Sequence, residues 1–307
     1  PSYAQAGTYK GISFRASDGE LASSLEIVIT VNDTPLAGGV SPSRPFTAFP
    51  KLSAGTADIA VGNVTGDARD EIVVGSGPGV TGEVKVFSND GTQLGSFFPY
   101  GKKMSRGVRI ASCALTGDGV DEIVTVPGPG VLPRVRAFAA DGKSLLGQGF
   151  LGTLKSTAAG AYLACGDLDG DRKAEIVVGP AAKSSSTILI YSSQGKLIRK
   201  FSASTGNLQT GIKVAVADVT GDGRGEILTV PASKRAHVQI FSGTGKRIRA
   251  GFLAFGKTIS DSTSIAVGDV QGTESLLLIV GSSRRNQRNL ALFTPAAKSV
   301  RHFLLPA

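Results

Sequence analysis

Short apolar runs separated by glycine- and aspartate-rich turns dominate the chain from residue 46 onwards, and none of them has helical spacing. Apolar runs of about four to eight residues, rich in valine and isoleucine, are typical of β-strands buried on both faces. The first unit predicts four strands: Ile59–Val64, Glu71–Gly75, Glu83–Phe87 and Leu94–Phe98. We therefore expect residues 46–307 to be built from β-strands without helices.

An acidic residue at the start of the second strand of each unit marks an internal repeat. The acids, and the leucine that replaces them in the fifth unit, lie 51, 53, 51 and 51 residues apart: Glu71, Glu122, Glu175, Glu226 and Leu277. Four strands in a unit of ~50 residues, repeated several times, are typical of a β-propeller, in which four-stranded blades surround a central channel. The sequence predicts an all-β propeller of five blades, from repeats at about residues 51–104, 105–156, 157–209, 210–260 and 261–307. The alternative is that these five units are part of a larger ring.

The turn before Glu175 holds the densest group of oxygen donors in the chain. Asp167, Asp169 and Asp171 occupy alternate positions around Gly170, and Glu175 follows. Carboxylates in this arrangement can surround a hard cation with oxygen. The alternative is that glycine and aspartate simply form a tight Asx-type turn.

Residues 1–34 differ from the repeats and predict a β-hairpin. Apolar residues alternate with polar ones on both sides of a turn at Asp18-Gly19. The sequences Ala6-Gly7-Thr8-Tyr9 and Val31-Asn32-Asp33-Thr34-Pro35 resemble the last two strands of bacterial immunoglobulin-like or cadherin-like surface domains. The resemblance implies that the missing strands come from upstream sequence or from a neighbouring subunit. Residues 35–45, rich in proline, glycine and serine, are expected to be a linker.

The repeated units resemble FG-GAP/VCBS repeats, the blades of integrin α-chain propellers and of many bacterial surface proteins. The resemblance covers about residues 46–307 and is carried by Val61–Asp67, Val73–Gly79, Gly166–Asp171 and Ala217–Gly223. It implies an extracellular or cell-surface propeller that binds Ca²⁺ in the turns between first and second strands. The segment Phe46–Pro50 resembles a fourth strand, which would close the ring by pairing with the last blade.

The resemblance also implies the calcium ligands, with side chains at positions 1, 3, 5 and 9 of the turn and a carbonyl at position 7. The third turn offers Asp167, Asp169, Asp171, Lys173 (carbonyl) and Glu175, and the fourth offers Asp218, Thr220, Asp222, Arg224 (carbonyl) and Glu226. The first turn offers Asn63, Thr65, Asp67, Arg69 (carbonyl) and Glu71. Occupancy is expected to follow the number of carboxylates, which is four in the third turn, three in the fourth and two in the first and second. Position 9 is glutamate here, where the family usually has aspartate.

Two cysteines lie in matching strands of successive repeats. Cys113 and Cys165 are one register step apart, which points their side chains to opposite faces of their strands. We therefore expect both to be free core residues.

Positive charge is concentrated towards the C-terminus. Residues 181–307 contain 17 lysines and arginines but 6 acids, whereas residues 1–180 contain 16 and 18. A basic surface attracts anionic polymers, although a solvated charged rim would have the same composition. In a four-stranded blade the loops between second and third strands lie opposite the calcium turns. Two of these loops are basic, and their residues are candidate contacts for an anionic glycan: Lys234, Arg235, Arg284, Arg285 and Arg288.

Several function classes lack support in the sequence. The G-x-G-x-x-G pattern of Gly77–Gly82 precedes a strand, whereas a dinucleotide site requires a helix there. No nucleophile–base pair, histidine metal motif or aromatic stacking surface for nucleic acid is evident, and no apolar run reaches the ~18–20 residues of a membrane helix. We expect a non-enzymatic protein that recognises a surface glycan or protein in adhesion. The alternative is a structural subunit of a cell-surface filament or sheath, assembled through residues 1–34.

Overall fold

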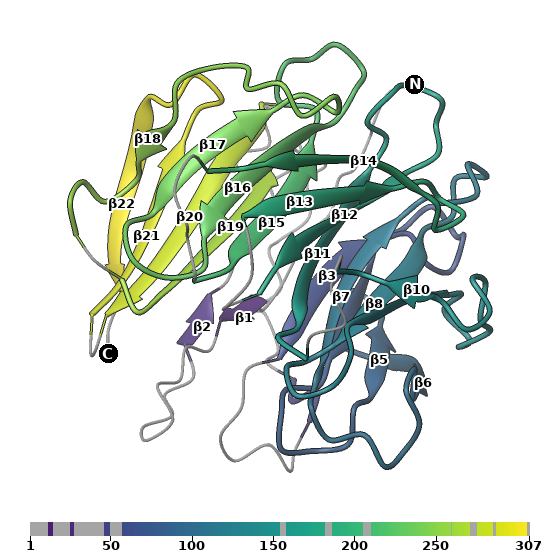
Figure 1. Cartoon of the computed structure of the whole chain (residues 1–307). Helices are drawn as coiled ribbons and strands as arrows, with labels where there is room; N and C mark the ends of the chain where they lie inside the picture. Colours follow the sequence, from purple (N-terminus) through teal and green to yellow (C-terminus); the bar gives the residue numbers. More distant parts are fainter. Residues whose placement is uncertain are drawn as a thin grey trace, which may run out of the picture.

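The computed structural model consists of strands and turns. It describes residues 12–14, 25–27, 46–49, 57–153, 158–181, 186–204, 210–258, 260–270, 275–284 and 287–305, and none of these is helical. Five antiparallel sheets of four strands each surround a common centre (Figure 1). The prediction of an all-β propeller with five four-stranded blades is therefore confirmed.

Each blade contains four consecutive strands, the first near the centre and the fourth at the rim (Figure 1). Blade 1 contains β3 (Asp58–Gly62), β4 (Glu71–Gly75), β5 (Val84–Phe87) and β6 (Gln93–Phe97). Blade 2 contains β7 (Val108–Cys113), β8 (Glu122–Pro127), β9 (Arg134–Phe138) and β10 (Phe150–Leu151). Blade 3 contains β11 (Ala161–Gly166), β12 (Glu175–Pro180), β13 (Thr187–Tyr191) and β14 (Leu197–Ser202). Blade 4 contains β15 (Ile212–Ala217), β16 (Glu226–Pro231), β17 (His237–Phe241) and β18 (Phe252–Leu253). Blade 5 contains β19 (Ser262–Gly268), β20 (Leu277–Arg284), β21 (Gln287–Phe293) and β22 (Ser299–Leu305).

The hydrophobic core lies between neighbouring blades. Every residue of β4, β8, β12 and β16 is buried, as the continuous apolar runs predict. Val177 of β12, for example, packs with Ile212 and Ile227 of blade 4. Ile279 occupies the corresponding position in β20 and is only partly buried. In blades 1–4 this face of the sheet packs against the next blade. In blade 5 the same face is more exposed at Ile279.

An aromatic contact at the rim joins each blade to the next. A phenylalanine of the outer strand packs against an aromatic residue of the following blade's third strand, with ring centroids 4.3–5.0 Å apart. The pairs are Phe97–Phe138, Phe150–Tyr191, Phe201–Phe241 and Phe252–Phe293. The first three phenylalanines also lie against a glycine in the turn after that third strand: Gly142, Gly195 and Gly245. Because the ring occupies the space of a Cβ, this position needs glycine for packing as well as for its backbone angle.

The segment 46–49 occupies on blade 1 the place that an outer strand occupies on later blades. Phe46 packs on Phe87 with centroids 4.7 Å apart and lies against Gly91. Lys85 Nζ donates to Ala48 O at 3.0 Å, as Gln239 Nε2 donates to Ala203 O at 2.6 Å three blades further on. The resemblance of this segment to a fourth strand is thus reflected in its contacts. Its docking partner is blade 1, whereas blade 5 has its own outer strand, β22.

The expectation of free cysteines is wrong, because Cys113 and Cys165 form a disulfide with Cα atoms 5.9 Å apart. Both residues pack in the core between blades 2 and 3. The two side chains do point to opposite faces of their own sheets, since Cys113 pairs with Glu122 and Cys165 with Ile176, one register step earlier. Neighbouring blades stack face to face, so opposite faces of successive blades meet. The bond therefore ties the inner strands of two blades together.

Of the N-terminal region the structure describes two short antiparallel strands, β1 (Ile12–Phe14) and β2 (Leu25–Ile27). Their pairing agrees with a hairpin, and the rest of the predicted immunoglobulin-like segment and the linker lie outside the described residues.

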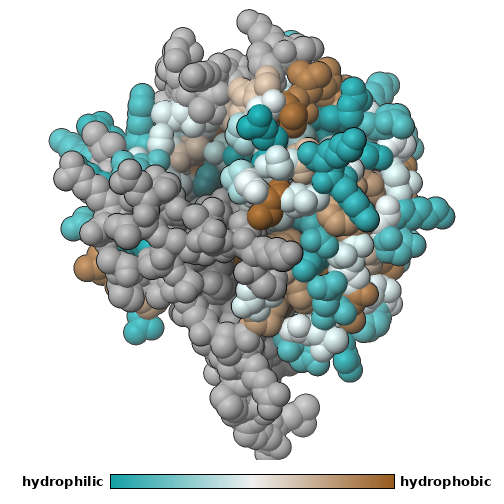
Figure 2. Space-filling view, turned by 90° about the horizontal axis from the view of Figure 1, so that it is seen from below, coloured by the Kyte–Doolittle hydropathy of each residue, from teal (hydrophilic) through white to brown (hydrophobic). Residues whose placement is uncertain are grey.

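Large apolar side chains on the surface, such as Leu94 and Leu132, are scattered. Figure 2 accordingly shows hydrophobic atoms in small groups among hydrophilic ones. No described helix is long and apolar enough to cross a membrane.

We predict that Gly195→Ala destabilises the protein more than Gly101→Ala does. Both glycines have φ of 81°, so both substitutions incur the left-handed strain of about 1–2 kcal/mol. A Cβ at Gly195 would also lie 2.5 Å from a ring carbon of Phe150, whereas nothing lies within 4 Å at Gly101. Overpacking should add about 1–3 kcal/mol in urea unfolding. Equal losses for the two variants would show that the ring contact does not constrain this turn.

Reduction of the disulfide should lower the stability of the folded protein. Cys113 and Cys165 are 52 residues apart, and cross-links of this kind typically contribute ~2–4 kcal/mol. The Cys113→Ala/Cys165→Ala double variant should unfold at lower urea concentration and become insensitive to reductant. Mass spectrometry after alkylation without reductant should find the wild-type thiols unlabelled, and labelled thiols in folded protein would contradict the bond.

Candidate metal centre

A buried glutamate holds the turn between the first and second strands in each of blades 1–4. Its Oε2 accepts the backbone N–H of the turn's second residue at 2.6–3.0 Å. The four pairs are Glu71 with Val64, Glu122 with Leu115, Glu175 with Leu168 and Glu226 with Val219. The glutamate at position 9 therefore has a structural role in every turn, whether or not a cation binds. The sequence alone did not reveal this role, although its signal was glutamate at the position where the repeats that this chain resembles usually have aspartate.

In two of these turns the third residue gives the other glutamate oxygen a hydrogen-bond donor. In the second turn Thr116 Oγ1 donates to Glu122 Oε1 at 3.1 Å, and in the fourth Thr220 Oγ1 donates to Glu226 Oε1 at 3.3 Å. The third turn has Asp169 at this position. An ionised aspartate offers acceptors only. The third turn thus brings two carboxylates together where the other two turns have a donor and an acceptor.

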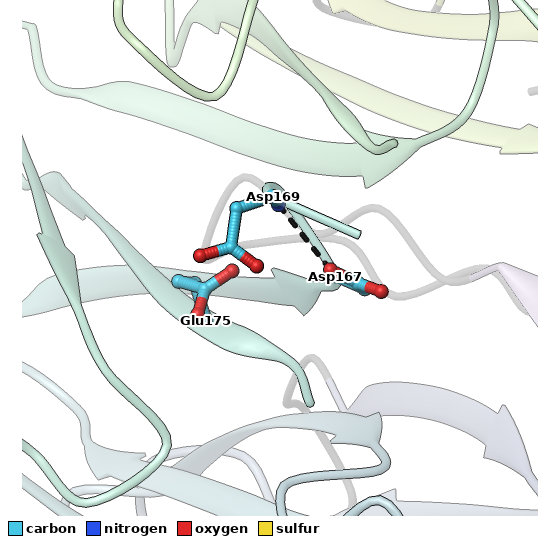
Figure 3. A group of neighbouring side chains, drawn as sticks. All are labelled: Asp167, Asp169 and Glu175. Atoms are coloured by element: carbon cyan, nitrogen blue, oxygen red, sulfur yellow. Dashed lines mark hydrogen bonds between the residues drawn. The ribbon is translucent and has the colours of Figure 1, made fainter. Parts of the chain in front are cut away.

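Three carboxylates meet in the third turn. Asp167, Asp169 and Glu175 each offer an oxygen, and these oxygens lie within 4.8 Å of one another. Figure 3 shows the carboxylates of Asp169 and Glu175 turned towards one another, with Asp167 beside them. Within the described part of the chain, this is the one group of three or more such residues with this spacing.

The backbone of the turn fixes the position of Asp167. Its Oδ1 accepts the N–H of Gly170 at 2.6 Å and that of Asp169 at 3.2 Å, and its Oδ2 accepts the N–H of Arg172 at 2.7 Å. Arg172 has a left-handed φ of 69°, which wraps the chain around this carboxylate. These bonds form the Asx-type turn that the sequence offers as the alternative to a metal site. Turn and metal site are compatible, because each carboxylate oxygen has a second lone pair.

The surroundings of the third turn disfavour the ionised form of the Glu175 carboxyl. Burial raises the pKa of the Glu175 carboxyl to about 7, and the neighbouring charges of Asp169, Asp171 and Asp167 act in the same direction. Burial also raises the pKa of Glu226 in the fourth turn. A cation among these oxygens would remove the repulsion and favour the ionised form.

The remaining predicted ligands are distributed unevenly. Asp171, exposed like Lys173, accepts the N–H of Lys173 at 2.8 Å and lies outside the three-carboxylate group. In the fourth turn Asp218 accepts the N–H groups of Gly221 and Gly223, much as Asp167 does in the third. Thr220 donates to Glu226, and Asp222 accepts the N–H of Arg224 at 2.9 Å.

One predicted ligand of the first turn, Asn63, instead contacts the second turn. Asn63 Oδ1 accepts the N–H of Gly66, while its Nδ2 donates to Gly119 O of the second turn at 3.2 Å. Asp67 accepts the N–H of Arg69 at 2.9 Å. Thr65 donates its N–H to Glu71 at 3.0 Å. The first turn therefore has the same backbone frame as the third, without a third carboxylate beside Glu71.

The basic loops lie at the other end of the blades. Because the four strands of a blade are antiparallel and consecutive, the loops after second strands are opposite the turns that end first strands. Lys234 pairs with Ser260 in an isolated bridge, which fixes the backbone of its loop next to Arg235. Arg284 ends β20 and Arg288 lies in β21, and Arg285 is outside the described residues.

Comparison with known families supports the repeat assignment. Residues 167–229 match the model of the FG-GAP-like repeat. The match begins at the first aspartate of the third turn and includes the whole fourth turn. A search of curated proteins by sequence found no match.

Similar solved structures share the fold at low sequence identity. A protein of unknown function from Bacteroides caccae is 12% identical with a TM-score of 0.51, over 84% of this chain and 84% of that one. A chain of the COPII outer coat vertex is 13% identical with a TM-score of 0.51, over 83% of this chain and 62% of that one. A biofilm matrix protein of V. cholerae is 16% identical with a TM-score of 0.45, over 84% of this chain and 41% of that one. The chain thus spans less than half of the biofilm protein, and the first two similarities show the fold alone.

Proposed function

We propose that the protein is an extracellular β-propeller that binds Ca²⁺ in the turn of blade 3 and recognises an anionic glycan or surface protein through its basic loops. The observation that carries the calcium proposal is Asp169. It stands where the second and fourth turns have a threonine that donates to the buried glutamate at position 9, here called the clamp glutamate. The resulting group of acceptors requires a cation or a proton between them.

The donor set suits calcium better than a transition metal. Asp167, Asp169 and Glu175 supply carboxylate oxygens, and Asp171 and the Lys173 carbonyl belong to the same turn. Ca²⁺ prefers six to eight oxygen ligands in a flexible arrangement, with water completing the shell. The exposed side of this turn gives water access. Calcium in the fourth and first turns is proposed at lower affinity, because they hold fewer carboxylates.

The recognition proposal rests on charge and position. Lys234, Arg235, Arg284 and Arg288 come from loops or strand ends of blades 4 and 5, at the end opposite the calcium turn. Binding residues on loops held by a rigid scaffold are a common arrangement in β proteins. Guanidinium groups bind carboxylates and sulfates through paired hydrogen bonds. An acidic polysaccharide fits this chemistry.

The extracellular part of the proposal draws support from the disulfide. Bonds such as Cys113–Cys165 form and persist in oxidising environments and are rare in the cytosol. The FG-GAP-like match over residues 167–229 is compatible with the same location.

The calcium proposal predicts that Asp169→Thr abolishes calcium-dependent stabilisation. For the wild type, a free Ca²⁺ concentration of 100 times Kd should stabilise the fold by about 2.7 kcal/mol, because the ion binds only the folded state. The threonine should instead donate to Glu175, as Thr220 does to Glu226. Differential scanning calorimetry should therefore find a calcium-independent Tm for this variant, and in EDTA that Tm should equal or exceed the wild-type value.

The matched control is Thr116→Ala in the second turn, which has alanine at position 1 and should retain the wild-type response to calcium. A wild-type Tm that EDTA leaves unchanged would refute the metal assignment. An Asp169→Thr variant that still responds fully to calcium would move the site to another turn.

The recognition proposal predicts that Arg284→Ser/Arg285→Ser elutes from a heparin or polygalacturonate column at lower salt than the wild type. Each lost cation removes a screened attraction to the anionic chain. The control is Lys246→Ser/Arg247→Ser, which removes the same charge from the turn between β17 and β18, at the calcium end. Equal elution shifts for the two variants would indicate non-specific charge, and unchanged retention of the first would refute the basic loops as a binding surface.

A further inference from the structure

A group of charged side chains forms where the first strands of the blades come together. Four residues occupy the same register position in the first strands of blades 1–4, each opposite the fifth residue of its second strand. They are Asp58 of β3, Arg109 of β7, Tyr162 of β11 and Lys213 of β15. All four are partly accessible to solvent. Residues that are far apart in the sequence thus supply one polar cluster.

Arg109 and Lys213 share one aromatic partner. The guanidinium carbon of Arg109 lies 4.0 Å from the centroid of the Tyr162 ring, and Lys213 Nζ lies 5.7 Å from it. Arg109 NH1 also donates to Ala161 O at 2.6 Å, which fixes the guanidinium between blades 2 and 3. Two cations from different blades, the guanidinium of Arg109 and the ammonium of Lys213, therefore both lie near the Tyr162 ring. The other N–H groups of the guanidinium remain available as donors.

Asp58 supplies the one carboxylate of the cluster. Its Oδ2 accepts the N–H of Ile110 at 2.9 Å. Burial raises its pKa, against the attraction of Arg109 and Lys213. Burial and the repulsion of Arg109 lower the pKa of Lys213 to about 8, while Asp58 acts in the opposite direction. The three charges therefore interact across blades 1, 2 and 4.

The cluster has one more cation than it has carboxylates. Within the described part of the chain, Lys213 Nζ has no hydrogen-bond acceptor or carboxylate in contact, and the carboxylate of Asp58 is already engaged by a backbone N–H. An ammonium largely surrounded by protein is costly unless a partner with negative charge or hydrogen-bonding oxygen compensates it. The cluster is thus arranged to receive an anion.

We propose that Arg109, Tyr162 and Lys213 form a binding site for the anionic group of a small organic ligand, such as the carboxylate of a uronic acid. Arg109 and Lys213 donate hydrogen bonds to its oxygens, and the Tyr162 ring holds both cations in place. Asp58 limits the affinity, because its charge opposes that of the ligand. The site lies near the beginning of the first strands, away from the turns at their ends. It therefore lies apart from the calcium turn, at the end of the blades that also carries the basic loops, and it consists of other residues than those loops.

The test is a calorimetric titration of the full chain with glucuronate, with glucose as the neutral counterpart. The wild type should bind glucuronate and not glucose. Lys213→Met, which keeps the apolar stem and removes the charge, should weaken glucuronate binding by about tenfold or more, the usual effect of losing a charge-assisted hydrogen bond. Asp58→Asn should strengthen it, because the amide oxygen still accepts the Ile110 N–H while the opposing charge is gone.

Lys200→Met is the control, because Lys200 lies exposed in β14 and should leave the affinity unchanged. If Lys213→Met does not fold, the gain expected for Asp58→Asn still tests the site. Sulfate competing with glucuronate would extend the ligand class to sulfated sugars, in support of an anion site. Titrations in EDTA separate this site from the calcium proposal. Equal binding of glucose and glucuronate, or wild-type affinity in both cluster variants, would refute the inference.

Discussion

The fold depends on the aromatic packing that joins each blade to the next one at the rim. A phenylalanine from one outer strand packs on an aromatic residue of the following blade and, at four of the five contacts, fills the space beside a turn glycine. Single four-stranded sheets of this size bury little surface alone, so stability comes from these repeated interfaces. The contact of Phe46 with blade 1 extends the series by one member at the N-terminal side. The aromatic contacts between blades therefore recur once in each sequence repeat.

In the turns between first and second strands, the residue at position 9 has a structural role, and the residue at position 3 sets the chemistry. A clamp glutamate organises all four acidic turns, and this requirement explains why the acid recurs in blade after blade. Position 3 then distinguishes the third turn from the second and fourth, because Thr116 and Thr220 donate a hydrogen bond to the glutamate whereas Asp169 adds a further carboxylate. The identity of this one side chain therefore distinguishes the turn in which three carboxylates meet. Counting carboxylates in the sequence also singles out the third turn, but it does not reveal the hydrogen bonds of position 3.

The three-carboxylate turn and the basic loops lie at opposite ends of the propeller. The acidic turn of blade 3 lies at one end, and the lysines and arginines of the loops in blades 4 and 5 lie at the other. The polar cluster of Asp58, Arg109, Tyr162 and Lys213 lies between the first strands, near their beginning. A propeller built in this way can separate a stabilising ion from a ligand surface, because the rigid blades keep the two apart.

The sequence by itself determined the strands, the number of blades and the members of the acidic turn, because these depend on local patterns that repeat at a fixed spacing. Asp167, Asp169 and Glu175 are near neighbours in the chain, so their meeting needed no knowledge of the rest of the fold. The disulfide was missed because it depends on which faces of adjacent blades oppose each other, and strand alternation gives only the direction within one blade. The approach of Lys213 to Asp58, over three blades, depends on the curvature of the whole propeller. Only the tertiary structure decides such contacts, because the rotation from each blade to the next brings first strands that are distant in the sequence together around the centre.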